Sequence, residues 1–127
     1  MKNNKEICQG DIYMVSFKDT VGSEQSLNGR PCLIVQNNIG NKHSSTTVIV
    51  PLTKRNKKPI PTHYLLKKED YTFLEYDSLV LGEQIKCIDI NKRILERKIG
   101  KINQKDLNKI ISIICDNLKG KAGKSCY

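Results

Sequence analysis

The sequence predicts a mainly β domain with added α structure (α+β class), in which a small curled β-barrel carries a C-terminal helix. Short apolar segments, separated by Gly, Pro and Asn turns, occupy most of the chain. A clear helical pattern comes only near the C-terminus, and the order of segments does not alternate as it does in a doubly wound sheet. With 127 residues, 38% of them hydrophobic, the chain suits one domain with a modest core.

Three strands are predicted in the first half of the chain. Each has the length and composition of a strand, and the first, GDIYMVSF, alternates along its length. A polar loop, residues 18–29, follows the first strand, and a Gly-Asn turn signal, in residues 38–45, follows the second. Pro51 marks an edge or a bulge in the third strand because proline has no N–H for the ladder. The predicted strands cover residues 10–17, 31–37 and 46–53.

The second half alternates polar turns with further strands. Residues 54–61, KRNKKPIP, are basic and broken by prolines, and residues 67–77 read as a loop or short turn. Gly82 divides the segment SLVLGEQIKCID into two apolar runs, and RILERKIGKI has the pattern of a last strand with one basic face. The predicted strand segments cover residues 62–66, 78–89 and 93–102.

Residues 103–120 form the clearest predicted helix. Asn103 can cap its start, and Asp106, three residues later, gives the pattern of a capping box. Gly120 is placed to stop the helix. Apolar residues recur at the spacing of one helical face, at Leu107, Ile110, Ile111, Ile114 and Leu118.

The sequence also predicts the domain bounds and the cellular location of the protein. We expect a single domain over residues 1–118 and a flexible basic tail over residues 119–127. The N-terminal residues have no apolar signal-peptide core, and no apolar run is long enough to span a bilayer, so the prediction is a cytoplasmic protein without a membrane partner.

The five cysteines include no C-x-x-C pair, which disfavours a zinc site or a disulfide framework. Cys32, Cys87 and Cys115 lie in apolar stretches and are predicted to be small core residues.

The charge of the chain points to an anionic partner. Lys and Arg total 22 against 13 Asp and Glu, a net charge of +9. Such a surface attracts nucleic acid, an acidic protein or a membrane surface. Two basic runs, within residues 54–68 and 92–101, are either solvated edges or the walls of a groove that follows a phosphate backbone, and composition does not choose between these interpretations.

Motifs for metal or cofactor chemistry do not occur in the sequence. It contains no P-loop, no H-E-x-x-H, no nucleophile elbow and no paired acidic metal ligands. The only histidines are His43 and His63. We therefore expect that an enzyme built on this chain works without a metal and without a cofactor.

Several motifs together resemble the MazF/PemK toxins of bacterial type II toxin–antitoxin modules. The segments GDIYMVSF, VGSEQ, GRPCLIVQN, VIVPLT, PTHY and DSLVLGEQIKCID, with the final helix, occur in the family order over about residues 8–118. The resemblance implies an SH3-like barrel of the CcdB/MazF type that acts as a homodimer. It also implies a sequence-specific, metal-independent endoribonuclease that cuts single-stranded RNA, inhibits translation and growth, and is neutralised by a cognate acidic antitoxin.

The resemblance assigns catalysis to Arg30, before the second strand, and to Thr53, at the end of the third. In such a reaction the 2′-hydroxyl of RNA attacks the adjacent phosphate and leaves a 2′,3′-cyclic phosphate and a 5′-hydroxyl. Arg30 offers a bidentate fork for phosphate oxygens, and Thr53 adds a hydroxyl donor. Arginine is a poor base, so the general base stays open, with His63 as a candidate.

Further positions match the RNA-binding parts of the family. The loop that closes on RNA corresponds to Ser23, Glu24 and Gln25. Lys86 and Cys87 depart from the family pattern, which has Arg and Thr there, so residue 86 keeps the positive charge but loses the bidentate fork. The remaining predicted RNA-binding residues are Asn37, Thr62, His63, Ser78, Glu83, Gln84 and Lys86.

Two other functions stay open at this point. A non-catalytic barrel of the same superfamily would bind a protein target, as the CcdB-type toxins poison DNA gyrase. A small RNA-binding barrel without activity is the third possibility. The presence of both Arg30 and Thr53 favours the ribonuclease, because a pure binder would not need them.

Overall fold

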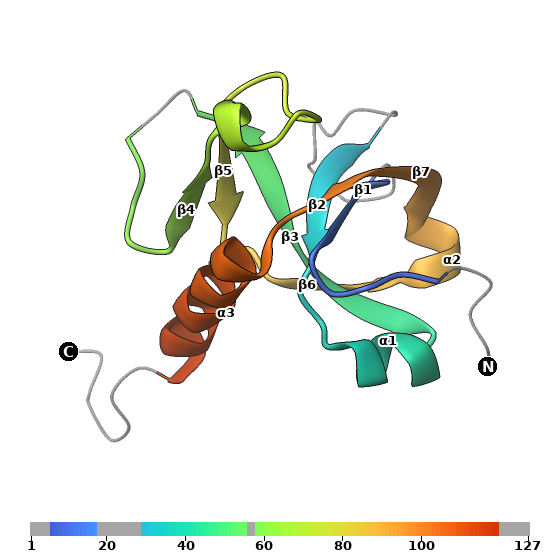
Figure 1. Cartoon of the computed structure of the whole chain (residues 1–127). Helices are drawn as coiled ribbons and strands as arrows, with labels where there is room; N and C mark the ends of the chain where they lie inside the picture. Colours follow the sequence, from blue (N-terminus) through green and yellow to red (C-terminus); the bar gives the residue numbers. More distant parts are fainter. Residues whose placement is uncertain (1–5, 18–28, 56–57, 120–127) are drawn as a thin grey trace.

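The computed structural model describes residues 6–17, 29–55 and 58–119, and its architecture is a curled antiparallel sheet with a long C-terminal helix (Figure 1). The α+β class is thereby confirmed. The helical elements are α1 (Asn38–His43), the 3₁₀ turn η1 (Lys68–Asp70), α2 (Ile90–Arg93) and α3 (Gln104–Lys119). The strands are β1 (Asp11–Val15), β2 (Arg30–Ile34), β3 (Thr46–Lys54), β4 (His63–Leu66), β5 (Ser78–Leu81), β6 (Lys86–Asp89) and β7 (Ile94–Lys101).

Strand β3 organises the sheet, whose order is β4-β5-β3-β2-β1-β7. One edge of β3 pairs with β2, and the other pairs with β6 near its start and with β5 near its end. Val50 and Pro51 lie in the gap between the β6 and β5 ladders, which fits a residue that has no N–H to donate. Among the described strands no ladder joins β4 to β7, so backbone hydrogen bonds do not close this curled sheet into a barrel.

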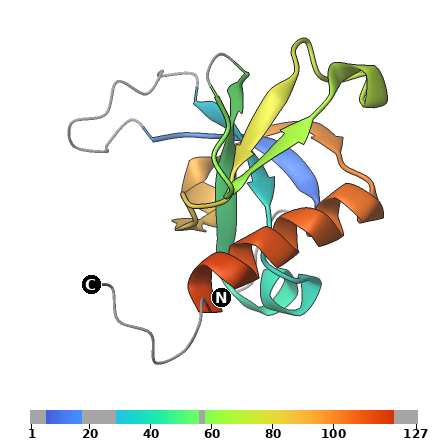
Figure 2. The same cartoon turned by 90° about the vertical axis from the view of Figure 1, so that its left-hand side faces the viewer.

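Alternation along the strands divides the core between the two sides of the sheet. In β2, Leu33 packs in a cluster with Ile110 and Ile114 of α3. Its neighbours Cys32 and Ile34 point the other way, into a second cluster. This period of two follows from strand geometry, and it places α3 along one side of the sheet (Figure 2).

Helix α3 begins as predicted, but its first turn is held differently. Asn103 caps it, since its Oδ1 accepts a hydrogen bond from the Asp106 N–H at 2.8 Å. Asp106 does not complete a capping box. Its carboxylate accepts hydrogen bonds from the Tyr64 and Tyr71 hydroxyls, and the Asn103 N–H donates instead to the Tyr71 hydroxyl oxygen at 3.2 Å. The helix is thereby fixed to β4 and to the residue after η1.

The buried face of α3 is shorter than its sequence pattern suggests. Leu107, Ile110 and Ile114 are buried and Ile111 is partly buried. Leu118, predicted on the same face, is 66% exposed because the helix extends beyond the sheet at this end.

Two other predictions are corrected. The turn expected at residues 38–45 is the short helix α1, because the Asn37 side chain caps it by accepting the Gly40 N–H at 2.9 Å. Cys32 is buried as predicted, but Cys87 and Cys115 are exposed, since they lie on the outward faces of β6 and α3. None of the helices in the described residues is long and apolar enough to cross a membrane.

Candidate active site

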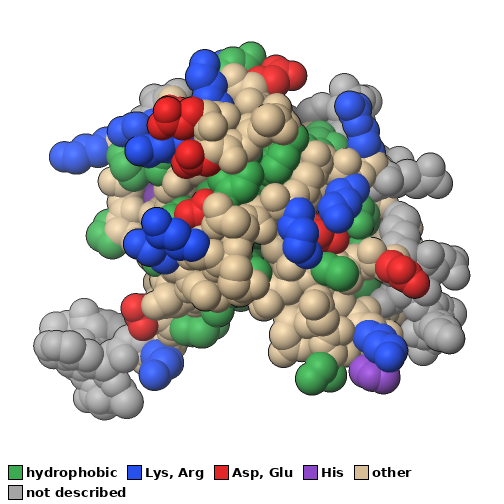
Figure 3. Space-filling view, viewed as in Figure 1, with side chains coloured by type: hydrophobic (Ala, Val, Ile, Leu, Met, Phe, Trp, Pro, Cys, Tyr) green, Lys and Arg blue, Asp and Glu red, His purple; other side chains and the backbone are tan. Residues whose placement is uncertain are grey.

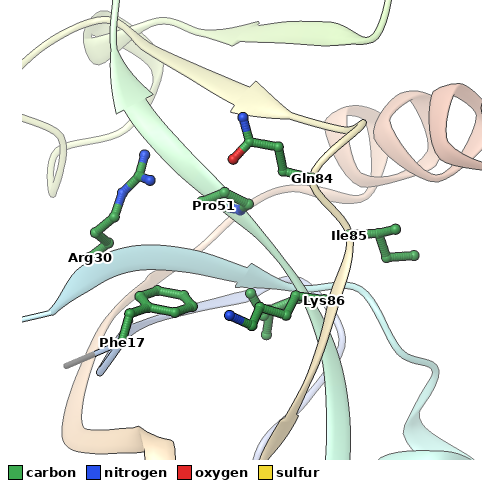
Figure 4. Close-up of a pocket in the computed structure, with 7 residues that line it drawn as sticks. Phe17, Arg30, Pro51, Gln84, Ile85 and Lys86 are labelled. Carbon is green, nitrogen blue, oxygen red and sulfur yellow. The ribbon is translucent and has the colours of Figure 1, made fainter. Parts of the chain in front are cut away.

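A cavity of about 280 Å³ opens on the side of the sheet away from α3, where β2 begins and the β5–β6 connection crosses β3. Arg30 and Gln84 reach toward the space above Pro51 from opposite sides, and Lys86 extends toward Phe17 (Figure 4). The cavity is lined by Phe17, Arg30, Ile49, Pro51, Gln84, Ile85 and Lys86.

The register of β2 against β3 places Arg30 next to Thr53. Cys32 pairs with Pro51, and the register extended by two residues sets Arg30 opposite Thr53. The Arg30 Nη2 donates to the Leu52 carbonyl oxygen at 3.4 Å, so the guanidinium lies against the backbone just before Thr53. Thr53 is partly buried and leaves β3 on the same face as Pro51, although it does not itself line the cavity.

The cavity is electrostatically positive. No ion pair among the described residues involves Arg30 or Lys86. The Lys86 Nζ lies 4.8 Å from the centroid of the Phe17 ring, a cation–π contact that leaves its charge uncompensated. Behind Arg30, burial raises the pKa of the Cys32 thiol to about 12, although Arg30 and Lys86 act in the opposite direction. Cys32 is therefore a neutral core residue and no nucleophile at neutral pH.

Thr62, His63 and Glu83 bind one another at the base of the β5–β6 connection. The Glu83 carboxylate accepts the Thr62 hydroxyl at 3.0 Å and lies 3.2 Å from the His63 Nε2. Burial would raise the pKa of Glu83, but hydrogen bonds from its own N–H, His63 and Thr62 outweigh it and lower the pKa. The His63 Nδ1 accepts the Ile60 N–H at 3.3 Å, and the side chain is 4% exposed. With both ring nitrogens engaged, His63 is poorly placed as the base that the sequence left open.

This cluster fixes the connection that carries Gln84 and leads into β6 at Lys86. The Gly82 N–H donates to the Thr62 carbonyl oxygen at 3.0 Å, and a Cβ at Gly82 would lie 2.6 Å from that oxygen. Only glycine fits this approach without a shift. The Gln84 N–H then donates to the Leu81 carbonyl oxygen at 3.0 Å, which turns the chain over Pro51.

The other predicted RNA-binding residues lie apart from the cavity or outside the described residues. Asn37 caps α1 and borders a second cavity, of about 320 Å³, next to Ile111 and Cys115. Ser78 begins β5, and its hydroxyl donates to the Tyr76 carbonyl oxygen at 3.0 Å. Ser23, Glu24 and Gln25 lie outside the described residues.

Phe17 and Ile85 line the cavity but were not predicted as site residues. Phe17 has a signal in the sequence, because it is an aromatic at the end of the first predicted strand. Ile85 has none that distinguishes it from a core residue, and its 37% exposure depends on the turn that the Thr62–His63–Glu83 cluster holds.

The comparison with known families decides the assignment of the chain. The model of the family described as "PemK-like, MazF-like toxin of type II toxin-antitoxin system" matches residues 8–118. The chain belongs to the PemK/MazF toxin family. It is 37% identical over 107 residues to a protein named Endoribonuclease MazF from Staphylococcus saprophyticus. This alignment covers 84% of this chain and 86% of the relative. The PemK/MazF toxin described here is thus a homologue of an endoribonuclease.

Solved structures share the fold. An endoribonuclease in complex with its cognate antitoxin, from a mycobacterial species, has a TM-score of 0.70 at 24% identity, over 90% of this chain and 96% of that one. MazF from Deinococcus radiodurans also gives 0.70, at 18% identity, over 91% and 98% of the two chains. At these identities the likeness establishes the MazF-like fold of the curled sheet and its C-terminal helix.

Proposed function

We propose that this PemK/MazF toxin is a sequence-specific endoribonuclease of the cytoplasm that cuts single-stranded mRNA without a metal or cofactor. The observation that carries the proposal is the Arg30 guanidinium, held against β3 beside Thr53 at the edge of a positive cavity. A scissile phosphate placed there meets a planar fork of donors, a hydroxyl and a second cation, Lys86.

The reaction uses the nucleophile of the RNA itself. The 2′-hydroxyl attacks the adjacent phosphorus, the P–O5′ bond breaks, and the products are a 2′,3′-cyclic phosphate and a 5′-hydroxyl. Arg30 binds the nonbridging oxygens as negative charge grows on them, and Thr53 donates to the same group. Each such donor lowers the barrier by about 3–4 kcal/mol when it is aimed at the transition state. Arg30 acts here as an electrostatic stabiliser rather than as a base, since a guanidinium is a poor base and a good bidentate donor.

Base selection falls to the β5–β6 connection. Gln84 is exposed and offers both a donor and an acceptor to a base edge, and the Phe17 ring offers an apolar surface on the other side of the cavity, next to Lys86 (Figure 4). Lys86 supplies a single point charge rather than a fork, so it contributes attraction for phosphate more than geometry. By their match to the family motif, Ser23, Glu24 and Gln25, which lie outside the described residues, are included in the proposed RNA-binding set.

Two protein partners are part of the proposal. An acidic antitoxin would be drawn to a chain of net charge +9 and would cover Arg30. A second copy of the chain would cover apolar side chains left in water, among which Ile39 is 76% and Leu118 66% exposed. Light scattering tests the homodimer, and copurification with an acidic product of the neighbouring gene tests the antitoxin.

The decisive experiment is an incubation of the purified chain with a long RNA of known sequence in EDTA, followed by mapping of both new ends. We expect cuts at a short recurrent sequence, cyclic phosphate ends, and loss of cutting in Arg30→Ala and Thr53→Val. Binding without cutting would refute the assignment of catalysis to this cavity. Intact RNA together with inhibited DNA gyrase would replace the ribonuclease with a protein-directed toxin.

A further inference from the structure

A second basic cavity lies at the end of β3, outside the catalytic cavity. It has a volume of about 310 Å³ and is lined by Lys54, Arg55, Lys68, Tyr76 and Asp77. We call this set the Tyr76 cluster. Three of its side chains are cationic and one is acidic, and no ion pair within the described part of the chain neutralises these cations. Figure 3 shows basic side chains gathered over this upper part of the molecule, with acidic ones among them.

The backbone of the Tyr76 cluster is fixed, while its cationic side chains reach into water. Asp77 accepts the Arg55 N–H through its carbonyl oxygen at 3.0 Å and the Lys68 N–H through its Oδ1 at 2.9 Å. These bonds hold three segments of the chain together around the cavity. The Asp77 carboxylate is thereby engaged with backbone, and Lys54, Arg55 and Lys68 stay exposed and available to an anion.

The aromatic ring of this cluster is also accessible. Tyr76 is 51% exposed, and the Lys54 Nζ lies 4.1 Å from the centroid of its ring. An exposed ring with cations around it is the combination that binds single-stranded nucleic acid, because bases stack on the ring while the cations follow the phosphates.

We infer that the Tyr76 cluster is an accessory subsite for single-stranded RNA, which binds a nucleotide flanking the one cut at Arg30. The inference rests on the proposed function, since Thr53 and Lys54 are consecutive in β3 and their side chains leave on opposite faces. An RNA strand whose phosphate lies at Arg30 and Thr53 reaches Lys54 and Tyr76 by passing over the end of β3. One base stacks on Tyr76, and its phosphates lie near Lys54, Arg55 and Lys68.

The test measures how KM depends on RNA length in the wild type and in variants of residue 76. Oligonucleotides that contain the mapped cut site are extended on either side by about one to six nucleotides, a range within the site size of a single small binding domain. In the wild type, extension on one side lowers KM. Tyr76→Ala abolishes this gain, so KM for the extended RNA rises by about tenfold, the contribution of one base–aromatic stack. The shortest substrate is cut with unchanged kcat and KM. Tyr76→Phe keeps the ring and keeps the gain.

Charge is tested separately. Binding is measured with the same RNAs carrying a 2′-deoxy nucleotide at the cut site, which removes the nucleophile. Lys54→Ala with Arg55→Ala lowers the slope of log Kd against log salt by about 0.7 for each phosphate of the single strand that the variant no longer binds. Lys42→Ala, which removes one positive charge from α1 at the opposite end of β3, is the control for charge loss outside the cluster and leaves length dependence unchanged.

Each outcome separates the subsite from the ribonuclease. Wild-type protein that gains nothing from longer RNA, or Tyr76→Ala that weakens short and long RNA equally, overturns the subsite while cutting remains. A chain that never cuts RNA overturns the proposed function, and in that case binding of single-stranded RNAs of graded length by the wild type and by Tyr76→Ala still measures the subsite. If Tyr76→Ala weakens binding of an acidic antitoxin peptide but not of RNA, the surface belongs to a protein partner and the inference is wrong.

Discussion

The Tyr76 cluster and the surroundings of Asp11 are both rich in lysine, but only the lysines near Asp11 form ion pairs among the described residues. Asp11 in β1 is buried, and its carboxylate lies 3.2 Å from the Lys98 Nζ and 3.4 Å from the Lys101 Nζ of β7. It also accepts the Cys8 N–H at 2.9 Å. In the Tyr76 cluster the acid that lines the cavity, Asp77, is bound to backbone instead. The lysines of β7 therefore neutralise a buried carboxylate of the fold, and those around Tyr76 have no such partner among the described residues.

The difference shows that a basic run has no single meaning. Both runs looked alike in the sequence, where they were either solvated edges or the walls of a groove. In the run at residues 92–101, Lys98 and Lys101 pair with the buried Asp11 carboxylate on the neighbouring strand β1. They serve the fold, because an unpaired buried charge would be costly. In the other run, no ion pair among the described residues involves Lys54, Arg55 or Lys68, and the same holds for Arg30 and Lys86. We propose that these cations bind phosphate.

The largest effect is expected from removing the uncompensated cation of the catalytic cavity. Arg30→Ala should slow single-turnover RNA cleavage by about 10²–10³-fold, because a donor aimed at the transition-state charge is removed. Arg30→Lys should recover only part of this, since it keeps the charge but loses the fork. Lys101→Ala serves as the control and should cut at the wild-type rate. A normal rate in Arg30→Ala would place the chemistry elsewhere.

The next largest effect is expected on stability, in the region around Asp11. Asp11→Asn should lower the free energy of unfolding by about 2 kcal/mol, because two ammonium groups lose a buried charged acceptor. Urea denaturation measures this change. RNA cleavage by the folded variant should stay at the wild-type rate. Unchanged stability combined with weaker cleavage would mean that the Asp11 region serves the RNA rather than the fold.

A third prediction contrasts Asp11, held by ammonium groups, with Asp106, held by two tyrosine hydroxyls. Burial and the hydrogen bond to Asp106 raise the pKa of Tyr71 from 10.0 to about 12. The folded state therefore keeps this proton longer than the unfolded chain, so the stabilisation is complete below pH 10 and is lost as the pH rises toward 12.

The measurement is thermal denaturation across this alkaline range. Tyr71→Phe is expected to be less stable at neutral pH, by about 1 kcal/mol for the missing hydrogen bond, and to lose less stability between pH 10 and pH 12. An alkaline decline as steep in the variant as in the wild type would show that Tyr71 does not titrate in this way.

The smallest effect belongs to a single lysine of the Asp11 region. Lys98→Ala should lower stability by less than about 1 kcal/mol, since its side chain is 48% exposed and Lys101 remains beside Asp11. The salt dependence of RNA binding should not change. A salt slope as reduced as that of the Lys54 and Arg55 variant would erase the distinction between the two regions.

Sequence patterns predicted the local elements well, for reasons that lie within each segment. Length and composition predicted β1, β2 and β3, with alternation in β1, and the helical rhythm with the Asn103 cap predicted the start of α3. Failures came where a side chain found a partner outside its own segment. Asp106 is bound by Tyr64 and Tyr71, and α1 forms around Asn41, whose Oδ1 accepts the Thr47 hydroxyl at 2.6 Å.

The site was predictable to a similar extent. The motifs located Arg30, Gln84 and Lys86, which line one cavity. Motifs carry no information on whether Thr62, His63 and Glu83 face RNA or one another, because that depends on how β4 and the β5–β6 connection meet. Their roles as RNA-binding residues, and those of Arg30 and Thr53 in catalysis, remain predictions that the cleavage experiments address.

By itself the sequence determined the strands, the final helix, the family and the positive charge, since each follows from residue types at short spacing. Only the tertiary structure decided which positive charges are neutralised. Asp11 and Lys101 are 90 residues apart in the chain, and β1 must pair with β7 before they meet. A charge becomes structural or functional according to its neighbours in space, which the folded sheet supplies.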